Sequence, residues 1–65
     1  MTNTATRERV NAYMELYGTP QRFIAKKIGL HGNTVNAWIN GKKELGIATL
    51  ARINQYIDDM ARGNV

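Results

Sequence analysis

Apolar residues recur three and four positions apart along most of the chain, with glycines between the successive apolar groups. This spacing puts the apolar side chains on one side of an α-helix and indicates amphipathic helices separated by short turns. No segment alternates apolar and polar residues as a half-buried β-strand does. We therefore expect residues 1–65 to form a single compact all-α domain of four to five helices.

The first two predicted helices lie on either side of Gly18, which favours a left-handed helix C-cap. The first helix begins after Thr4 or Thr6, because either hydroxyl can cap the free amides of a first turn. In the second helix, Thr19 is the expected N-cap and Pro20 the first helical residue. The expected buried residues are Val10, Tyr13, Met14 and Tyr17 in the first helix, and Ile24, Ala25 and Ile28 in the second.

The third predicted helix is short, running from Gly32 or Asn33 to Asn40 and ending at Gly41. Because histidine caps helices poorly, a later start with Asn33 as the cap is the alternative to a start at Gly32, and in that case the side chain of Asn33 is partly occupied by the backbone. The helix has an apolar side and a polar side at helical spacing. Val35, Trp38 and Ile39 form the apolar side, and Asn33, Asn36, Ala37 and Asn40 form the polar side.

A loop at Lys42–Glu44 precedes the fourth predicted helix, which begins near Ile47 and frays at Gly63. The apolar residues of this segment again follow helical spacing. We expect them all to be buried, and they are Ile47, Leu50, Ile53, Ile57 and Met60.

Charge is unevenly distributed along the chain. Residues 16–43 contain five basic residues and no acidic one, whereas the rest of the chain contains four basic and five acidic residues. The formal net charge of +4 therefore comes from the segment of the second and third helices. A basic surface attracts anionic partners such as nucleic acid or an anionic membrane. Asparagines on the polar side of the third helix, in place of bulky apolar residues, favour nucleic acid over a membrane.

Catalysis and cofactor binding find little support in the sequence. Cysteine is absent, and the single histidine, His31, cannot form a metal site alone and has no carboxylate nearby in sequence. Asp58 and Asp59 form a solvated pair at the end of the last helix. No glycine-rich phosphate loop follows a strand, and no apolar run approaches the roughly 18 residues of a membrane span. We expect a non-enzymatic cytoplasmic protein with no cofactor, no metal, no membrane segment and no small-molecule substrate.

Residues 20–41 have the pattern of two short helices joined by a tight turn, in which Gly29 supplies the backbone freedom. The pattern resembles the helix-turn-helix of the Cro/Xre, or lambda-repressor-like, DNA-binding family. The residues that carry the resemblance, at fixed spacing and without a gap, are Gln21, Ile24, Ala25, Gly29, Leu30, Thr34, Val35, Trp38, Asn40, Gly41, Lys42 and Lys43. The resemblance implies a lambda-repressor-like domain whose third helix enters the major groove of double-stranded DNA.

The resemblance also implies which residues contact DNA. The base-contact positions are Gly32, Asn33, Asn36 and Ala37. An asparagine amide can pair with N6 and N7 of adenine, and an alanine can touch a thymine methyl group. Gly32 has no side chain to contact a base, so discrimination between DNA sequences relies on the other positions and on DNA shape. The phosphate-contact positions are Gln21, Arg22, His31, Asn40, Lys42 and Lys43, of which Arg22 is inferred from its charge and position alone.

The expected function is that of a sequence-specific transcriptional regulator, a Cro-like repressor of a phage or mobile element that reads a short pseudo-palindromic operator. We expect a homodimer, at least on DNA, formed through the loop after Gly41 and the last helix, with Tyr56, Ile57 and Met60 as apolar contacts. The alternative is an antitoxin-like or other protein-interaction module with secondary DNA binding. An exposed apolar patch that includes Phe23, Tyr56 or Met60 favours that alternative.

Overall fold

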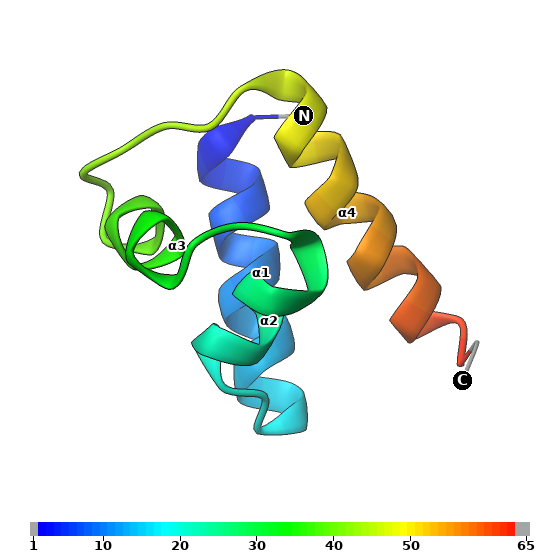
Figure 1. Ribbon diagram of the computed structural model, residues 1–65. Helices are drawn as coiled ribbons and strands as arrows, with labels where there is room; N and C mark the ends of the chain where they lie inside the picture. The colour runs from blue at the N-terminus through cyan, green and yellow to red at the C-terminus, as the bar shows by residue number, and fades with distance from the viewer. Residues whose placement is uncertain (1, 64–65) are drawn as a thin grey trace.

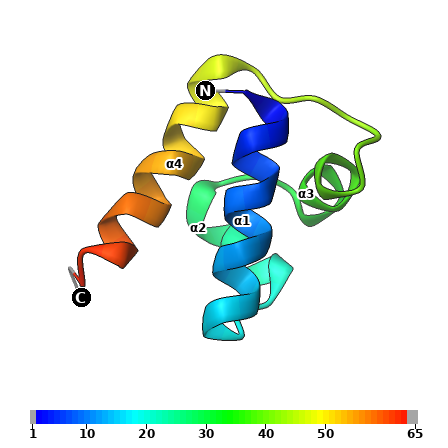
Figure 2. The same ribbon diagram turned by 180° about the vertical axis from the view of Figure 1, so that it is seen from behind.

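The computed structural model describes residues 2–63, and these residues form four α-helices and no strand. The helices are α1 (Asn3–Tyr17), α2 (Gln21–Ile28), α3 (Gly32–Ile39) and α4 (Ile47–Ala61). Figure 1 shows α1 and α4 side by side, α2 across α1, and α3 at one edge of the molecule, and Figure 2 shows the same arrangement from behind. The expected all-α architecture is confirmed with four helices in the described segment.

The start of α1 lies earlier than either residue predicted to cap it. Thr2 is the N-cap, and its hydroxyl accepts a hydrogen bond from the backbone N–H of Ala5 at 3.0 Å. Thr4 is helical, and Thr6 is buried, where its hydroxyl accepts from the side-chain amide of Asn54 at 3.1 Å. The prediction of a cap at Thr4 or Thr6 is wrong because a third threonine precedes them, and Thr6 instead ties α1 to α4.

The start of α2 is displaced by one residue from the prediction. Pro20 is the N-cap and Gln21 the first helical residue, so Thr19 does not cap this helix. The carbonyl of Pro20 accepts from the backbone N–H groups of Phe23 and Ile24 at 3.1 and 3.4 Å. The extended backbone of Pro20, with ψ 147°, explains why it stays outside the helix.

Glycine ends both α1 and α2 in the left-handed conformation, as predicted, with φ 65° at Gly18 and 76° at Gly29. Gly29 also leaves space for a side chain from α4. A Cβ at this position would lie 2.9 Å from the guanidinium of Arg52, which crosses from α4 to donate a hydrogen bond to the carbonyl of Ile28. Gly29 therefore serves both the turn between α2 and α3 and the attachment of α4 to that turn.

The core joins all four helices, with α2 packed on α3 and α1 packed on α4. Most of the predicted apolar positions lie in it, and Ala25 is buried where α2 meets its neighbours. Met14, Ile39 and Met60 are half-buried against its edge. The buried apolar residues are Val10, Tyr13, Ile24, Ala25, Ile28, Val35, Trp38, Leu50, Ile53 and Ile57.

Two residues predicted to be buried are exposed. Tyr17, the last residue of α1, is 58% exposed, and Ile47, the first residue of α4, is 73% exposed. Both have the correct helical spacing, but each lies one turn beyond the region where the helices pack. Tyr17 keeps a contact with the neighbouring ring of Tyr13, with 4.9 Å between the ring centroids.

The hydroxyl of Tyr56 is buried and makes no hydrogen bond within residues 2–63. Burial, together with the neighbouring Tyr13, raises the pKa of Tyr56 to about 12 from an ordinary value of 10.0. The unfolded chain therefore releases this proton near pH 10, whereas the folded protein keeps it until about pH 12. Stability that is complete below pH 10 is lost as the pH rises through this interval.

We expect Tyr56→Phe to raise the Tm by a few degrees, because removing an unpaired buried hydroxyl gains about 1 kcal/mol and a small domain gains roughly 4–8 °C per kcal/mol. The Tm of the variant should also fall less steeply than that of the parent between pH 10 and 12. Thermal unfolding followed by circular dichroism measures both effects. The control is Tyr17→Phe, which removes an exposed hydroxyl and should do neither; a lower Tm for Tyr56→Phe contradicts the assignment.

Candidate nucleic-acid interface

The turn between α2 and α3 is held by backbone hydrogen bonds and by one apolar side chain. The backbone N–H of Leu30 donates to the carbonyl of Ala25 at 2.9 Å, and that of Gly29 donates to Lys26 at 3.3 Å. Leu30 itself is half-buried against the core. These contacts fix the angle at which α3 leaves α2, so the pair behaves as one rigid unit.

The first turn of α3 is capped by His31, and the helix begins at Gly32. The imidazole Nδ1 of His31 accepts a hydrogen bond from the backbone N–H of Asn33 at 3.2 Å. Of the two predicted starts, the structure has the earlier one, at Gly32, and Asn33 is not the cap. The imidazole can take the place of a serine or threonine hydroxyl here because an Nδ1 that carries no proton accepts a hydrogen bond. Asn33 is exposed, and its side chain makes no hydrogen bond within residues 2–63.

Burial of the apolar side of α3 determines which of its residues face outward. Val35 and Trp38 are each 1% exposed and belong to the core. The four predicted base-contact positions lie on the other side, at the helical spacing i, i+1, i+4 and i+5. Gly32, Asn33 and Asn36 are exposed, and Ala37 is half-buried. The structure thus brings these four positions together on one outward side of α3.

Asn3, in the first turn of α1, holds both Trp38 and the loop after α3. Its side-chain oxygen accepts from the indole N–H of Trp38 at 2.8 Å and from the backbone N–H of Leu45 at 2.9 Å. Its side-chain amide donates to the carbonyl of Leu45 at 3.2 Å. One asparagine therefore satisfies the only polar atom of the buried tryptophan side chain and both backbone groups of Leu45.

Arg7, one turn further along α1, holds the C-terminal end of α3. Its guanidinium donates to the carbonyl of Trp38 and, at 2.8 Å, to the carbonyl of Lys43. The same group lies 3.5 Å from the carboxylate of Glu44 and 5.5 Å from the centroid of the Trp38 ring. A cation at this end of a helix also interacts favourably with the helix dipole. Arg7 and Asn3 together fix the position of the lysine-bearing loop relative to α3.

No local pattern in α1 predicts these contacts, since Asn3 and Arg7 meet partners 31 to 42 residues away in sequence. One signal exists in the helical spacing. Residues 3, 7, 10 and 14 share one side of α1, so two polar side chains lie in line with the buried Val10 and the half-buried Met14. Polar residues on an apolar side of a helix need hydrogen-bond partners in the fold.

The polar side of α3 is linked to α2 by side-chain amides. The amide nitrogen of Gln21 lies 3.3 Å from the side-chain oxygen of Asn36. The amide nitrogen of Asn40 lies 2.9 Å from the backbone oxygen of Asn36 and 3.4 Å from its side-chain oxygen. Three of the predicted DNA-contact residues therefore form a single hydrogen-bonded group.

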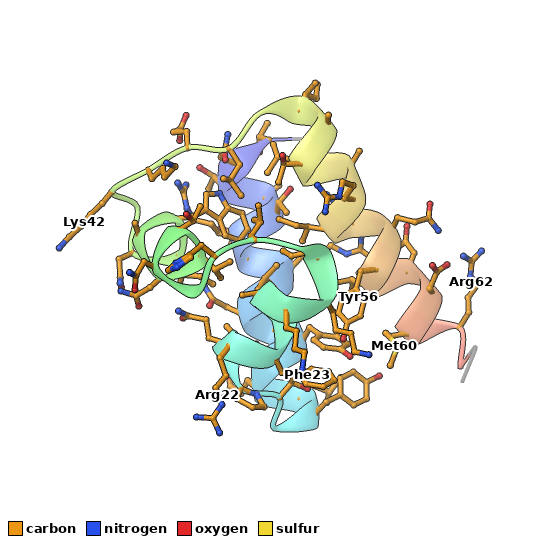
Figure 3. All side chains as sticks on the ribbon, viewed as in Figure 1. Arg22, Phe23, Lys42, Tyr56, Met60 and Arg62 are labelled. Carbon is orange, nitrogen blue, oxygen red and sulfur yellow. The ribbon has the colours of Figure 1, made fainter. Side chains whose placement is uncertain are left out.

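The positively charged residues among the predicted phosphate contacts lie around α3. Arg22, Lys42 and Lys43 are exposed, and no ion pair within residues 2–63 includes any of them. His31 is also exposed and caps α3. Figure 3 shows Lys42 extending outward from the loop after α3 and Arg22 extending outward from α2, on either side of α3. The positive charge around α3 is therefore not neutralised by the protein itself.

The two acidic residues of α4 are paired with arginines, Asp58 with one on α1 and Asp59 with the C-cap of α4 itself. Asp58 lies 2.5 Å from the guanidinium of Arg9, and Asp59 lies 2.6 Å from that of Arg62. Hydrogen bonds from Arg62 and then from Gln55 lower the pKa of the Asp59 carboxyl. Each carboxylate of α4 is thus neutralised by an arginine within the domain.

Comparison with known proteins gives one match. A family model described as "Helix-turn-helix" matches residues 10–58, most of the chain. The chain belongs to the Cro/C1-type helix-turn-helix family. No curated protein and no solved structure matches it.

Membership in this helix-turn-helix family confirms the predicted resemblance and supports a function in DNA binding and transcription regulation. The family is one of DNA-binding regulators, and not of enzymes. None of the helices in residues 2–63 has the length and apolar character required to span a membrane. Asn3 and Arg7, which contact α3, precede the matched segment.

We expect Asn3→Ala to shift the fluorescence emission of Trp38, the only tryptophan, and to lower the free energy of unfolding by about 1–3 kcal/mol. The variant leaves the indole N–H and the backbone N–H of Leu45 without their acceptor. Emission spectra and chemical unfolding measure these two effects. Asn11→Ala, the same change at an exposed position of α1, is the control, and equal behaviour of the two variants refutes the role of Asn3.

Proposed function

We propose that this protein is a sequence-specific transcriptional regulator, a Cro-like repressor of a phage or mobile element that reads a short operator through the major groove. One observation carries the proposal. The polar side of α3 is exposed because Val35 and Trp38 are buried on its other side, and unpaired cations lie around it. A short helix of this kind fits the major groove, and the cations bind the phosphates on either side.

The base contacts in this proposal come from α3. The side-chain amides of Asn33 and Asn36 hydrogen-bond to base edges, and Ala37 touches a thymine methyl group. Gly32 contributes no side chain and leaves room at the start of the helix. Because so few side chains contact bases, part of the discrimination between DNA sequences comes from the shape and deformability of the operator.

The phosphate contacts come from the residues around α3. Lys42 and Lys43 extend from the loop that Arg7 and Asn3 hold in place, and Arg22 extends from the first turn of α2. Gln21, His31 and Asn40 are the further phosphate-contact residues implied by the family. The first turn of α2 has no side-chain cap, so its free amides also attract a phosphate.

The protein acts as a homodimer on DNA, with two reading helices about one helical turn apart on a pseudo-palindromic operator, in the cytoplasm of a bacterial cell. An exposed apolar surface supports self-association. Phe23 is 43% exposed, and Tyr56 and Met60 are half-buried. Ile57, which was expected to contribute to the dimer surface, is a core residue with 6% exposure and has no part in this surface.

The same apolar surface favours one alternative, an antitoxin-like or other protein-interaction module with secondary DNA binding. Figure 3 shows Phe23, Tyr56 and Met60 toward the C-terminal half of α4, on the far side of the molecule from Lys42. Lys27 lies 5.3 Å from the centroid of the Phe23 ring, which leaves the rest of that ring accessible. A partner protein bound here would leave α3 free for DNA.

Selection of bound oligonucleotides from a random pool at near-physiological salt tests the proposal. We expect a short, approximately two-fold-symmetric motif for the parent protein. Asn36→Ala should lose the preference at one position of each half-site, because each lost base contact costs about 1–3 kcal/mol. Asn11→Ala should return the parent motif. Failure to enrich any sequence would favour the protein-interaction module instead.

For Lys43→Ala we expect weaker binding to every sequence alike and a decrease of about 1 in the slope of log K against log salt concentration, because one phosphate contact is lost. Titrations of a labelled operator at several salt concentrations measure the slope. Arg62→Ala removes the same charge at the opposite end of the molecule and should leave the slope nearly unchanged (Figure 3). A changed base preference in Lys43→Ala would show that this lysine reads a base.

A further inference from the structure

The side chains of Gln21, Asn36 and Asn40 form a hydrogen-bonded group. One backbone acceptor in it determines which atom of each carboxamide is the oxygen and which is the nitrogen. This acceptor is the backbone carbonyl of Asn36, which can accept a hydrogen bond but cannot donate one. The side-chain atom of Asn40 that lies 2.9 Å from it must therefore be the amide nitrogen. This contact determines the orientation of the Asn40 carboxamide without reference to any other side chain.

The orientation of Asn40 then determines that of Asn36. The same nitrogen of Asn40 lies 3.4 Å from the side chain of Asn36, and a donor there requires an acceptor opposite it. The atom facing Asn40 is therefore the side-chain oxygen of Asn36. From α2, the amide nitrogen of Gln21 approaches this oxygen to 3.3 Å. Two donors thus converge on one oxygen and occupy both of its lone-pair directions.

The amide nitrogen of Asn36 is left as the outward-facing polar atom. The residue is exposed, and this nitrogen makes no hydrogen bond within residues 2–63. Its two N–H groups are therefore donors without a partner in the free protein. An asparagine that pairs with adenine needs a free oxygen as well, to accept from the N6 amino group.

We infer that Asn36 acts as a donor only and selects a base edge that carries acceptors alone, guanine first. Guanine presents N7 and O6 as acceptors in the major groove, and thymine presents O4. At adenine, the N6 amino group would find no acceptor on Asn36. At cytosine, the N4 amino group, a donor, would face the donor of Asn36. The inference rests on the proposed function and replaces the adenine pairing expected for this position with a guanine contact.

Gln21 and Asn40 are positioning residues in this arrangement. Both amide hydrogens of Asn40 are used within α3, so only its side-chain oxygen is left, and this oxygen repels a phosphate. The arrangement therefore removes the side chain of Asn40 from the phosphate contacts that the family implies. Gln21 uses one amide hydrogen on Asn36 and keeps the second for a phosphate. Gln21 can therefore orient Asn36 and bind the DNA backbone at the same time.

The first test uses the operator obtained by selection and a modified base. Guanine should occupy the position whose preference Asn36→Ala loses. Replacing this guanine by 7-deazaguanine removes the N7 acceptor and should weaken binding of the parent about tenfold. The same replacement should not weaken binding of Asn36→Ala further. The inference is overturned if adenine occupies this position and if removing its N6 amino group weakens binding as much as replacing its N7.

The second test removes the donor supplied by α2. Gln21→Met keeps the length of the side chain and frees one lone pair of the Asn36 oxygen, so the preference at this position should shift from guanine toward adenine. The matched control is Gln55→Met on α4, where Gln55 donates to Asp59 at 2.9 Å. Gln21→Ala is the second variant, and circular dichroism confirms that each variant is folded.

The outcomes distinguish this inference from the proposed function. A parent protein that enriches no sequence overturns both. An enriched operator with an unchanged preference in both Gln21 variants overturns the inference alone, because the orientation of Asn36 then does not depend on Gln21. A shift in the Gln21 variants that is absent from Gln55→Met supports it.

Discussion

Burial of Trp38 is the constraint on which the rest of the structure depends. Its ring lies in the core at 1% exposure, so α3 has one possible rotation about its axis. Its indole N–H and its backbone carbonyl are both taken by α1, through Asn3 and Arg7. A domain of 65 residues has a total stability of only roughly 3–10 kcal/mol. A few hydrogen bonds at one residue therefore weigh heavily, and the presentation of the asparagines depends on them.

The two sides of α3 have different requirements. The inner side needs close packing against α2 and the core, which Val35 and Trp38 supply. On the outer side, the side chains must be exposed but still point in fixed directions. At Asn36, hydrogen bonds from neighbouring side-chain amides fix this direction. The lysine-bearing loop is held by hydrogen bonds to its backbone at Lys43 and Leu45 and by the packing of Leu45 against the core.

Helical periodicity predicted the fold because it depends on spacing that local sequence carries. It placed Val10, Ile24, Val35 and Ile53 in the core and Gly18 at a left-handed cap. It failed at Tyr17 and Ile47 because spacing does not say where a neighbouring helix stops. The position of the site followed from the motif. Its internal hydrogen bonds did not, since Gln21 to Asn36 and Asn3 to Trp38 join separate helices.

The place of Asn3 and Arg7 in the sequence has a consequence for protein engineering. Both residues precede the segment 10–58 by which the helix-turn-helix family is recognised. A chimera built by transplanting that segment alone would carry the amides of α3 into a new host but leave the indole of Trp38 and the carbonyl of Lys43 without their ligands. The transferable unit of this domain begins at the cap, Thr2, and not at the family boundary.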